Sequence, residues 1–260
     1  MQENNRDQIE KDLQQIADML LLNGTLTECP GLVHGKMGIA IFFFHYAEFT
    51  SNDLFADYAM VVIGEMLDQL HVNSPADYEN GLAGIGVGFD YLIRNDFLSI
   101  EDDICEDFDS RMYRAVMYDP CANFGLYGGL TGYGRYWLTR LRYCELEGLA
   151  RECLLQITVQ VGTILPNILI AEQADVFSFL SDLHKIPGFG QCSGLLDQCR
   201  KEWSLLEPLQ HKIKMPLQQI PGLDMEKSPV STGLLDGYAG EGMLRLVVLG
   251  QTDMSWMNLL

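Results

Sequence analysis

Basic side chains are scarce in this sequence. Against 36 Asp and Glu residues it has only 17 Lys and Arg, so its formal net charge is -19. A protein that binds nucleic acid through phosphates needs a surplus of basic side chains, and so does one that docks on an anionic membrane. The composition therefore predicts no nucleic-acid partner and no membrane partner.

Long apolar runs are also missing. The most apolar stretch, residues 39–44, is far too short to cross a bilayer. Residues 1–7 are polar and do not show the basic start and apolar core of a signal peptide. We therefore expect a cytoplasmic protein, in a compartment where thiols stay reduced.

Paired cysteine motifs are absent as well. No Cys-x-x-Cys occurs, and no Cys stands next to a His, which are the spacings that zinc sites often use. Seven isolated thiols remain, and buried, unreactive positions are the expectation for them. They are Cys29, Cys105, Cys121, Cys144, Cys153, Cys192 and Cys199.

Apolar residues at three- and four-residue spacing are abundant, and this spacing predicts amphipathic helices with one exposed face. Ser51 and Asn52 provide a capping start for the second of these helices, and Pro166 ends the fourth. The four apolar stripes are Ile9, Leu13, Ile16, Leu20; Phe55, Ala59, Val62, Met66, Leu70; Ile104, Phe108, Met112, Ala115; and Leu149, Cys153, Ile157, Val161, Ile164.

Three other segments are apolar on nearly all sides: residues 37–49, 86–93 and 244–249. A helix of this kind must be buried all round. Buried strands are the alternative, but the sequence shows neither a two-residue alternation nor hairpin turn residues. The pattern therefore favours an all-α fold.

The 25 glycines form an internal repeat. Four Gly-x-x-Gly elements occur, with their first glycines at positions 35, 81, 129 and 237, and those at 35, 81 and 237 begin just before the three apolar segments. The intervals are 46, 48 and 108 residues, which predicts a degenerate copy between the last two, at residues 188–194. About five units of about 50 residues then account for the chain.

Each unit is interpreted as a helical hairpin. An outer amphipathic helix leads into a glycine turn, where φ is positive or backbones crowd, and a buried inner helix runs back. One hairpin cannot bury its inner helix alone, so neighbouring hairpins must stack. We expect residues 1–260 to form a single α/α toroid of about five hairpins, with an open superhelical solenoid as the alternative.

The glycine elements at residues 31–39, 80–88, 129–135 and 233–244 resemble those of the lanthionine synthetase C-like family. The resemblance implies an α/α toroid with its Gly-rich loops at one end, around a central cavity. It also implies peptide modification: well-studied members are zinc enzymes that close thioether rings in ribosomally made peptides. They add a Cys thiolate to a dehydrated Ser or Thr.

The zinc ligands of that family are missing from this sequence. The family holds zinc with two Cys and one His, in an aromatic-Cys-x-Gly element and a Cys-His-Gly element. Here no Cys-His pair exists, and Cys192 is followed by Ser193 and Gly194. We therefore expect no zinc cofactor. The resemblance then implies maturation or binding of a ribosomally made peptide without thioether cyclase activity, with a peptide or a peptide-modifying enzyme as partner.

Repeat alignment selects the candidate site residues. The position before the first Gly of each element carries His34, Asn80, Gly128 and Asp236. His34 and Asp236 are the candidate catalytic residues; a loop hydrogen bond and helix stabilisation are the alternatives. The candidate substrate-binding residues are Asn80, Lys36, Tyr133, Arg135, Tyr238 and Glu241. For these, turn formation, packing, capping or ion pairing are the alternatives.

Two other functions remain open. A carbohydrate-active enzyme on an α/α toroid would need a carboxylate pair, for which Asp236, Glu241 and Asp90 are the candidates. Its sugar platform would comprise Tyr133, Tyr136, Trp137 and Tyr238. The other alternative is a non-catalytic protein-interaction scaffold.

Overall fold

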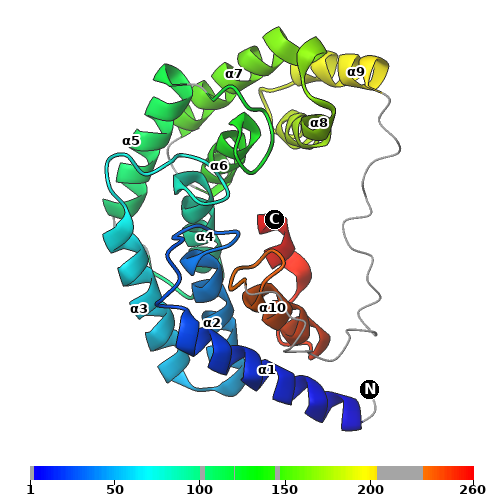
Figure 1. The fold of residues 1–260 in the computed structure, drawn as a ribbon. Coiled ribbons are helices and arrows are strands. Elements are labelled where there is room, and N and C mark those ends of the chain that lie inside the picture. The colour runs from blue at the N-terminus through cyan, green and yellow to red at the C-terminus, as the bar shows by residue number, and fades with distance from the viewer. Residues whose placement is uncertain (1–2, 100–102, 120, 144–146, 204–230) are drawn as a thin grey trace. The chain divides into compact units, whose positions relative to one another are not determined.

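The structure is a computed structural model, and it describes residues 3–99, 103–119, 121–143, 147–203 and 231–260. Within these ranges every regular element is a helix, and no strand occurs (Figure 1). The predicted all-α class is therefore confirmed. No helix in the same ranges is long and apolar enough to cross a membrane.

The described elements are α-helices (α) and short 3-10 helices (η). In chain order they are α1 (Glu3–Asn23), α2 (Lys36–Thr50), α3 (Asp53–Gln69), α4 (Leu82–Arg94), α5 (Asp103–Tyr118), α6 (Leu130–Tyr143), α7 (Glu147–Ile164), η1 (Leu165–Asn167), α8 (Ile170–His184), α9 (Cys192–Glu202), α10 (Tyr238–Val248) and η3 (Met254–Leu259).

The two predicted kinds of helix are both present. Helix α2 is buried without a break from Lys36 to Ala47, and α4 is buried from Leu82 to Leu92. Helix α3 instead buries one stripe, and Asn52 caps it by accepting the Leu54 N–H at 3.2 Å. Helix α7 ends at Ile164, directly before the turn that contains Pro166.

Glycine turns begin four of the helices. Helices α2, α4, α6 and α10 start immediately after Gly35, Gly81, Gly129 and Gly237. The backbone of Gly35 is extended, with φ at -125°, so a left-handed conformation is not the reason for glycine there. A Cβ at Gly35 would lie 2.4 Å from the Cys29 carbonyl oxygen. Close backbone approach is therefore what requires glycine.

The degenerate fourth copy was wrongly placed at residues 188–194. That segment leads into α9, which buries only one stripe, formed by Cys192, Leu196 and Cys199. Among the helices later in the chain, α7 and α8 pack against α6, and α8 begins at Ile170 after a turn without glycine. Phe179 of α8 fills the space beside Gly134 of α6, where a Cβ would lie 2.4 Å from the ring.

The chain divides into two compact units. The described part of the first unit comprises residues 3–75, 79–99 and 231–260, and that of the second comprises 76–78, 103–119, 121–143 and 147–203. In the first unit, α10 packs against α1 and α2, and α2 also packs against α3 and α4. In the second, α6 packs against α7 and α8. That the chain forms a single domain and that its helical hairpins close into a ring both remain predictions.

Each unit has a buried ion pair in its core. In the first unit, Arg245 of α10 is 1% exposed, and its Nε lies 3.4 Å from Asp12 Oδ2 of α1. In the second, Arg140 of α6 binds both carboxylate oxygens of Asp109 of α5, at 2.8 and 2.5 Å. Such pairs fix the relative position of their helices, because either charge alone would be costly to bury.

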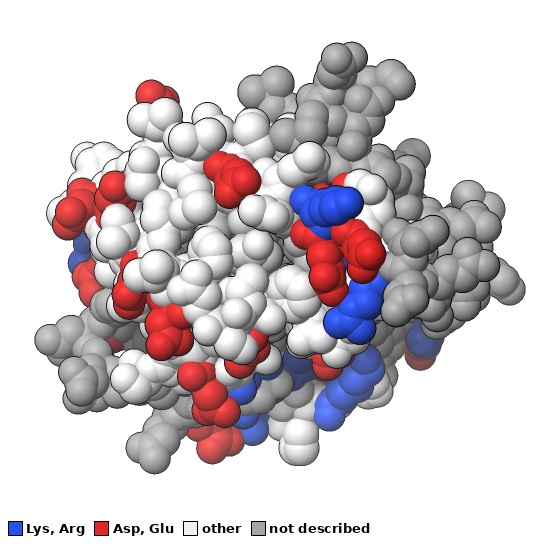
Figure 2. All heavy atoms as spheres, turned by 90° about the horizontal axis from the view of Figure 1, so that it is seen from below, with Lys and Arg blue, Asp and Glu red and all other residues white. Residues whose placement is uncertain are grey.

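Acidic side chains outnumber basic ones, 36 to 17, which gives the net charge of -19. On the face drawn in Figure 2, acidic side chains are scattered among uncharged ones, and basic side chains lie beside several of them. The exposed surface therefore offers few cations to an anionic partner.

Candidate functional site

Three glycine-containing loops of the first unit meet at one place. We call residues 29–35, 79–81 and 231–237 the loop cluster. The Val33 N–H donates to the Glu79 carbonyl at 3.3 Å, and the Leu235 N–H donates to the Val33 carbonyl at 3.0 Å. Loops from the first, second and last glycine elements are thus joined through their backbones.

Two glycines make this contact sterically feasible. A Cβ at Gly31 would lie 2.4 Å from the Asn80 Cα, and one at Gly233 would lie 2.4 Å from the His34 Cα. Real Cβ atoms do not approach other atoms so closely, so any other residue would force the loops apart. The repeated glycines thus serve to bring chemistry-bearing residues from distant repeats together.

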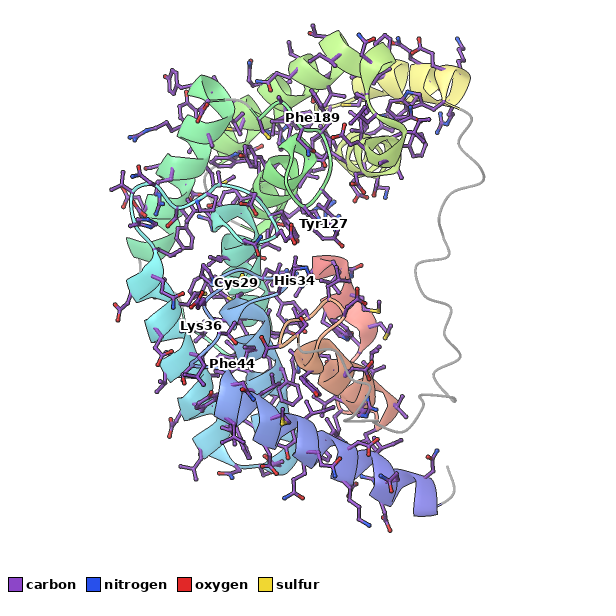
Figure 3. All side chains as sticks on the ribbon, in the orientation of Figure 1. Cys29, His34, Lys36, Phe44, Tyr127 and Phe189 are labelled. Carbon is purple, nitrogen blue, oxygen red and sulfur yellow. The ribbon has the colours of Figure 1, made fainter. Side chains whose placement is uncertain are left out.

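His34 lies at the surface of the loop cluster and is held by a carboxylate. Its Nε2 is 3.2 Å from Glu79 Oε1, and the two side chains are 38% and 35% exposed. A carboxylate accepts, so the neutral imidazole donates through Nε2–H. Nδ1 then carries the lone pair and can accept a proton or a hydrogen bond. Figure 3 shows His34 and Cys29 on the same part of the chain.

Asn80 belongs to the same cluster. Its Oδ1 accepts a hydrogen bond from the Cys29 thiol at 3.0 Å, and both side chains are half-buried. The carboxamide is therefore oriented by the first loop. Neither Glu79 nor Cys29 was selected from the sequence, although Glu79 directly precedes the selected Asn80.

Asp236 lies in the third loop of the cluster, directly before the glycine that begins α10. Its side chain is exposed, and its backbone is left-handed, with φ at 52°. Asp adopts this conformation more readily than most residues, because its short polar side chain bonds locally. The carboxylate is thus presented at the surface.

Lys36 is directed away from the surface. Its side chain is only 2% exposed, and its Nζ lies 2.8 Å from Glu65 Oε2 of α3. The ammonium thus joins α2 to α3, which agrees with the ion-pair alternative and leaves no surface for a substrate. Figure 3 marks the position of Lys36 relative to His34.

Tyr238 and Glu241 lie on the first turn of α10. Tyr238 is buried, while Glu241 is partly exposed and its carboxylate binds Arg245 one turn later. Since Arg245 also binds Asp12, the charge of Glu241 belongs to the ion network between α10 and α1. Both residues therefore serve packing in the first unit.

Tyr133 and Arg135, the remaining two candidates, lie on α6 of the second unit. Tyr133 is buried, and burial raises the pKa of its hydroxyl to about 12. Arg135 donates to the Tyr78 hydroxyl, and its Nη1 is 3.7 Å from Asp182 Oδ2. Tyr133 is thus part of the core of this unit, and Arg135 has partners inside it. The loop cluster itself brings together His34, Asn80 and Asp236.

The sugar platform of the carbohydrate alternative is not presented at a surface. Tyr136 and Trp137 are buried, and they pack edge to face at 5.2 Å between ring centroids. Asp90 is buried too, with one carboxylate oxygen 2.6 Å from Arg94 Nε. A sugar ring needs an accessible aromatic face and a carboxylate free to transfer a proton, so these residues do not support glycoside hydrolysis.

The described residues do not fit the zinc site of the resembled family. Within the described ranges, no group of three or more His, Cys, Asp and Glu could hold a metal ion. Cys192 is buried, and burial raises the pKa of its thiol. Zinc binds the thiolate, so this environment works against ligation. His184, the histidine nearest to Cys192 in the sequence, is exposed at the end of α8.

Comparisons with known proteins leave the family assignment as a resemblance. No family model matches the chain, and no match was found among curated proteins or solved structures.

Proposed function

We propose that the protein binds a ribosomally made peptide during its maturation, at the loop cluster and without a zinc-dependent cyclase step. One observation carries the proposal: loops from three repeats are joined by backbone hydrogen bonds and present His34, Asn80 and Asp236 together. The lanthionine synthetase C-like resemblance contributes the class of ligand.

The chemistry of the loop cluster suits a peptide. His34 offers an acceptor at Nδ1, and the exposed carboxylate of Asp236 accepts hydrogen bonds from main-chain amides or cationic groups. The backbone contacts hold these groups before any ligand arrives. Such preorganisation lowers the entropic cost of binding.

A display selection tests the proposal. A library of ribosomally made peptides, each linked to its own mRNA, is selected on the immobilised full-length chain. Enriched peptides are then measured by fluorescence anisotropy against His34→Ala and Asp236→Asn. We expect each variant to weaken binding about tenfold, the equivalent of about 1.4 kcal/mol. His34→Ala removes the acceptor at Nδ1, and Asp236→Asn removes the negative charge that strengthens a hydrogen bond from the peptide.

Two matched controls test whether a loss of peptide binding is specific to the loop cluster. His184→Ala removes an exposed histidine from the second unit, and Asp57→Asn removes an exposed carboxylate from α3. Both should bind like the unchanged protein. The proposal fails if no peptide is enriched, or if the enriched peptides bind His34→Ala and Asp236→Asn as well as the controls. Stoichiometric zinc in the purified protein would overturn the part of the proposal that excludes a zinc-dependent step.

A further inference from the structure

A separate pocket lies in the second unit, between the glycine loop before α6 and the turn before α8. Its volume is about 350 Å³, which falls at the lower end of the range for small-molecule sites. Residues of both segments line it, among them Asn123, Phe124, Ile164, Asn167, Leu169 and Glu172. All belong to the second unit, and none is a candidate from the sequence.

The two walls of the pocket are fastened to each other. The Phe124 N–H donates to Glu172 Oε1 at 3.3 Å, and the Leu126 N–H donates to Asp175 Oδ2 at 2.9 Å. On the other side of the loop, Thr131 Oγ1 donates to the Phe124 carbonyl at 2.9 Å. The glycine loop is thereby held against the first turn of α8, so the pocket exists before a ligand binds.

Part of the pocket wall is exposed and apolar. Ile164 is 39% exposed and Leu169 is 66% exposed, and both line the pocket. An aliphatic chain that covers them removes apolar surface from water, which is favourable by about 25 cal/mol per Å². A ligand with several methylene groups therefore fits this wall.

The charge of the pocket is negative. Glu172 is the charged residue among those that line it, and its Oε1 position is set by the Phe124 N–H. The N-terminus of α8 contributes about half a positive charge, which the full negative charge of the carboxylate exceeds. The side-chain oxygens of Asn123 and Asn167 are further acceptors beside it. These acceptors suit a cationic donor.

We propose that this pocket binds an aliphatic primary ammonium group of about the length of a lysine side chain. The methylenes lie on Ile164 and Leu169, and the ammonium binds the Glu172 carboxylate. A lysine side chain in a peptide and a free alkylamine share this chemistry. The pocket does not depend on the loop cluster, so it can be tested whether or not that cluster binds a peptide.

Titrations of the full-length protein test the pocket. The probes are n-pentylamine, the peptide acetyl-Gly-Lys-Gly-amide, and their neutral counterparts n-pentanol and acetyl-Gly-norleucine-Gly-amide. Binding is followed by the methyl NMR signals of Ile164 and Ile168. We expect at least one amine to shift both signals with a dissociation constant of about 1 mM, and the neutral counterparts to bind at least tenfold more weakly.

Three variants locate the binding groups. Glu172→Gln keeps an oxygen acceptor for the Phe124 N–H but removes the charge, so it should weaken amine binding at least tenfold. Leu169→Ser, at an exposed position, should weaken it about threefold. Glu202→Gln is the matched control, because Glu202 is an exposed carboxylate of the second unit, on α9, that does not line the pocket, and it should leave binding unchanged.

The outcomes are separable. Tighter binding of the lysine peptide than of n-pentylamine supports the pocket with a peptide ligand, and the reverse order supports it with a free amine. Equal binding of amines and neutral counterparts overturns the proposal, and so do shifts that do not saturate. Unchanged binding by both Glu172→Gln and Leu169→Ser, each with a melting curve showing that it is folded, overturns it as well.

Discussion

A buried histidine should make the first unit sensitive to acid. His45 of α2 is 6% exposed, and its Nε2 lies 2.8 Å from the Tyr91 hydroxyl of α4. Phe97 packs against the ring at 4.7 Å between centroids. Burial lowers the pKa of His45 to about 4, and the negative charge of Asp253 opposes this only in part. The native state therefore holds the imidazole neutral.

The sign and size of the effect follow from linkage. In the unfolded chain His45 titrates near 6.5, so as the pH falls the unfolded state takes up the proton first. The stability contribution is complete above about pH 6.5 and is lost as the pH falls toward 4. The gap between 6.5 and about 4 corresponds to about 3 kcal/mol in full, and to about 2 kcal/mol between pH 7 and pH 5.

The test compares the protein with His45→Gln, which keeps a hydrogen-bond donor for Tyr91 but has no titrating group. Urea unfolding is measured at pH 7, 6 and 5. Other titrating groups and the second unit are the same in both proteins, so their effects cancel in the difference. We expect the unchanged protein to lose about 2 kcal/mol more than the variant between pH 7 and pH 5. A difference that stays constant over this range would refute the reasoning. His184→Gln, at an exposed site, should behave like the unchanged protein.

Three further predictions concern stability, each measured by urea unfolding at pH 7. Gly233→Ala should lower the free energy of unfolding by about 2 kcal/mol, because its Cβ would lie 2.3 Å from the Val33 carbonyl oxygen. The control Gly64→Ala in α3, whose Cβ would meet nothing within 4 Å, should raise it by about 0.5 kcal/mol. Equal effects of the two substitutions would contradict the crowding argument. Asp12→Asn should cost about 2 kcal/mol, since it removes the charged partner of Arg245 on α1 and leaves Glu241 to compensate the buried guanidinium, and a loss below about 0.5 kcal/mol would show that this pair is dispensable. Asp109→Asn should lower the free energy of unfolding of the second unit by about 3 kcal/mol, because it leaves the buried Arg140 of α6 without the charge of Asp109. An unfolding midpoint equal to that of the unchanged protein would contradict this prediction.

Much of the helical architecture could be predicted from local patterns. The stripe of Ile9, Leu13, Ile16 and Leu20 is buried throughout, and helices begin directly after the glycines at 35, 81, 129 and 237. These features depend on residues close in the chain, which is why the sequence reveals them. The start of α8 was missed because its turn contains Pro166 and no glycine.

The candidate site was less predictable, because it depends on which loops meet. Repeat alignment selected His34, Asn80 and Asp236, and the loop cluster brings them together. It could not reveal that Glu79 holds His34, since the two lie in different repeats. Repeat alignment also could not show that the Lys36 side chain is directed away from the surface, because its partner Glu65 lies on α3. The spacing of the repeats identifies positions along the chain, whereas tertiary packing determines which side chain lies opposite each of them.

The loop cluster has a consequence for synthesis on the ribosome. Residues 231–237 close the cluster against residues 29–35, and α10 packs on α1 and α2. Contacts between residues so far apart in sequence form late, because a long loop must first be closed. The second unit lies between them in the chain and forms a compact unit of its own. The surface that carries His34 and Asp236 is therefore completed only when residues 231–237 have been made, so a nascent chain should lack the proposed peptide binding until then.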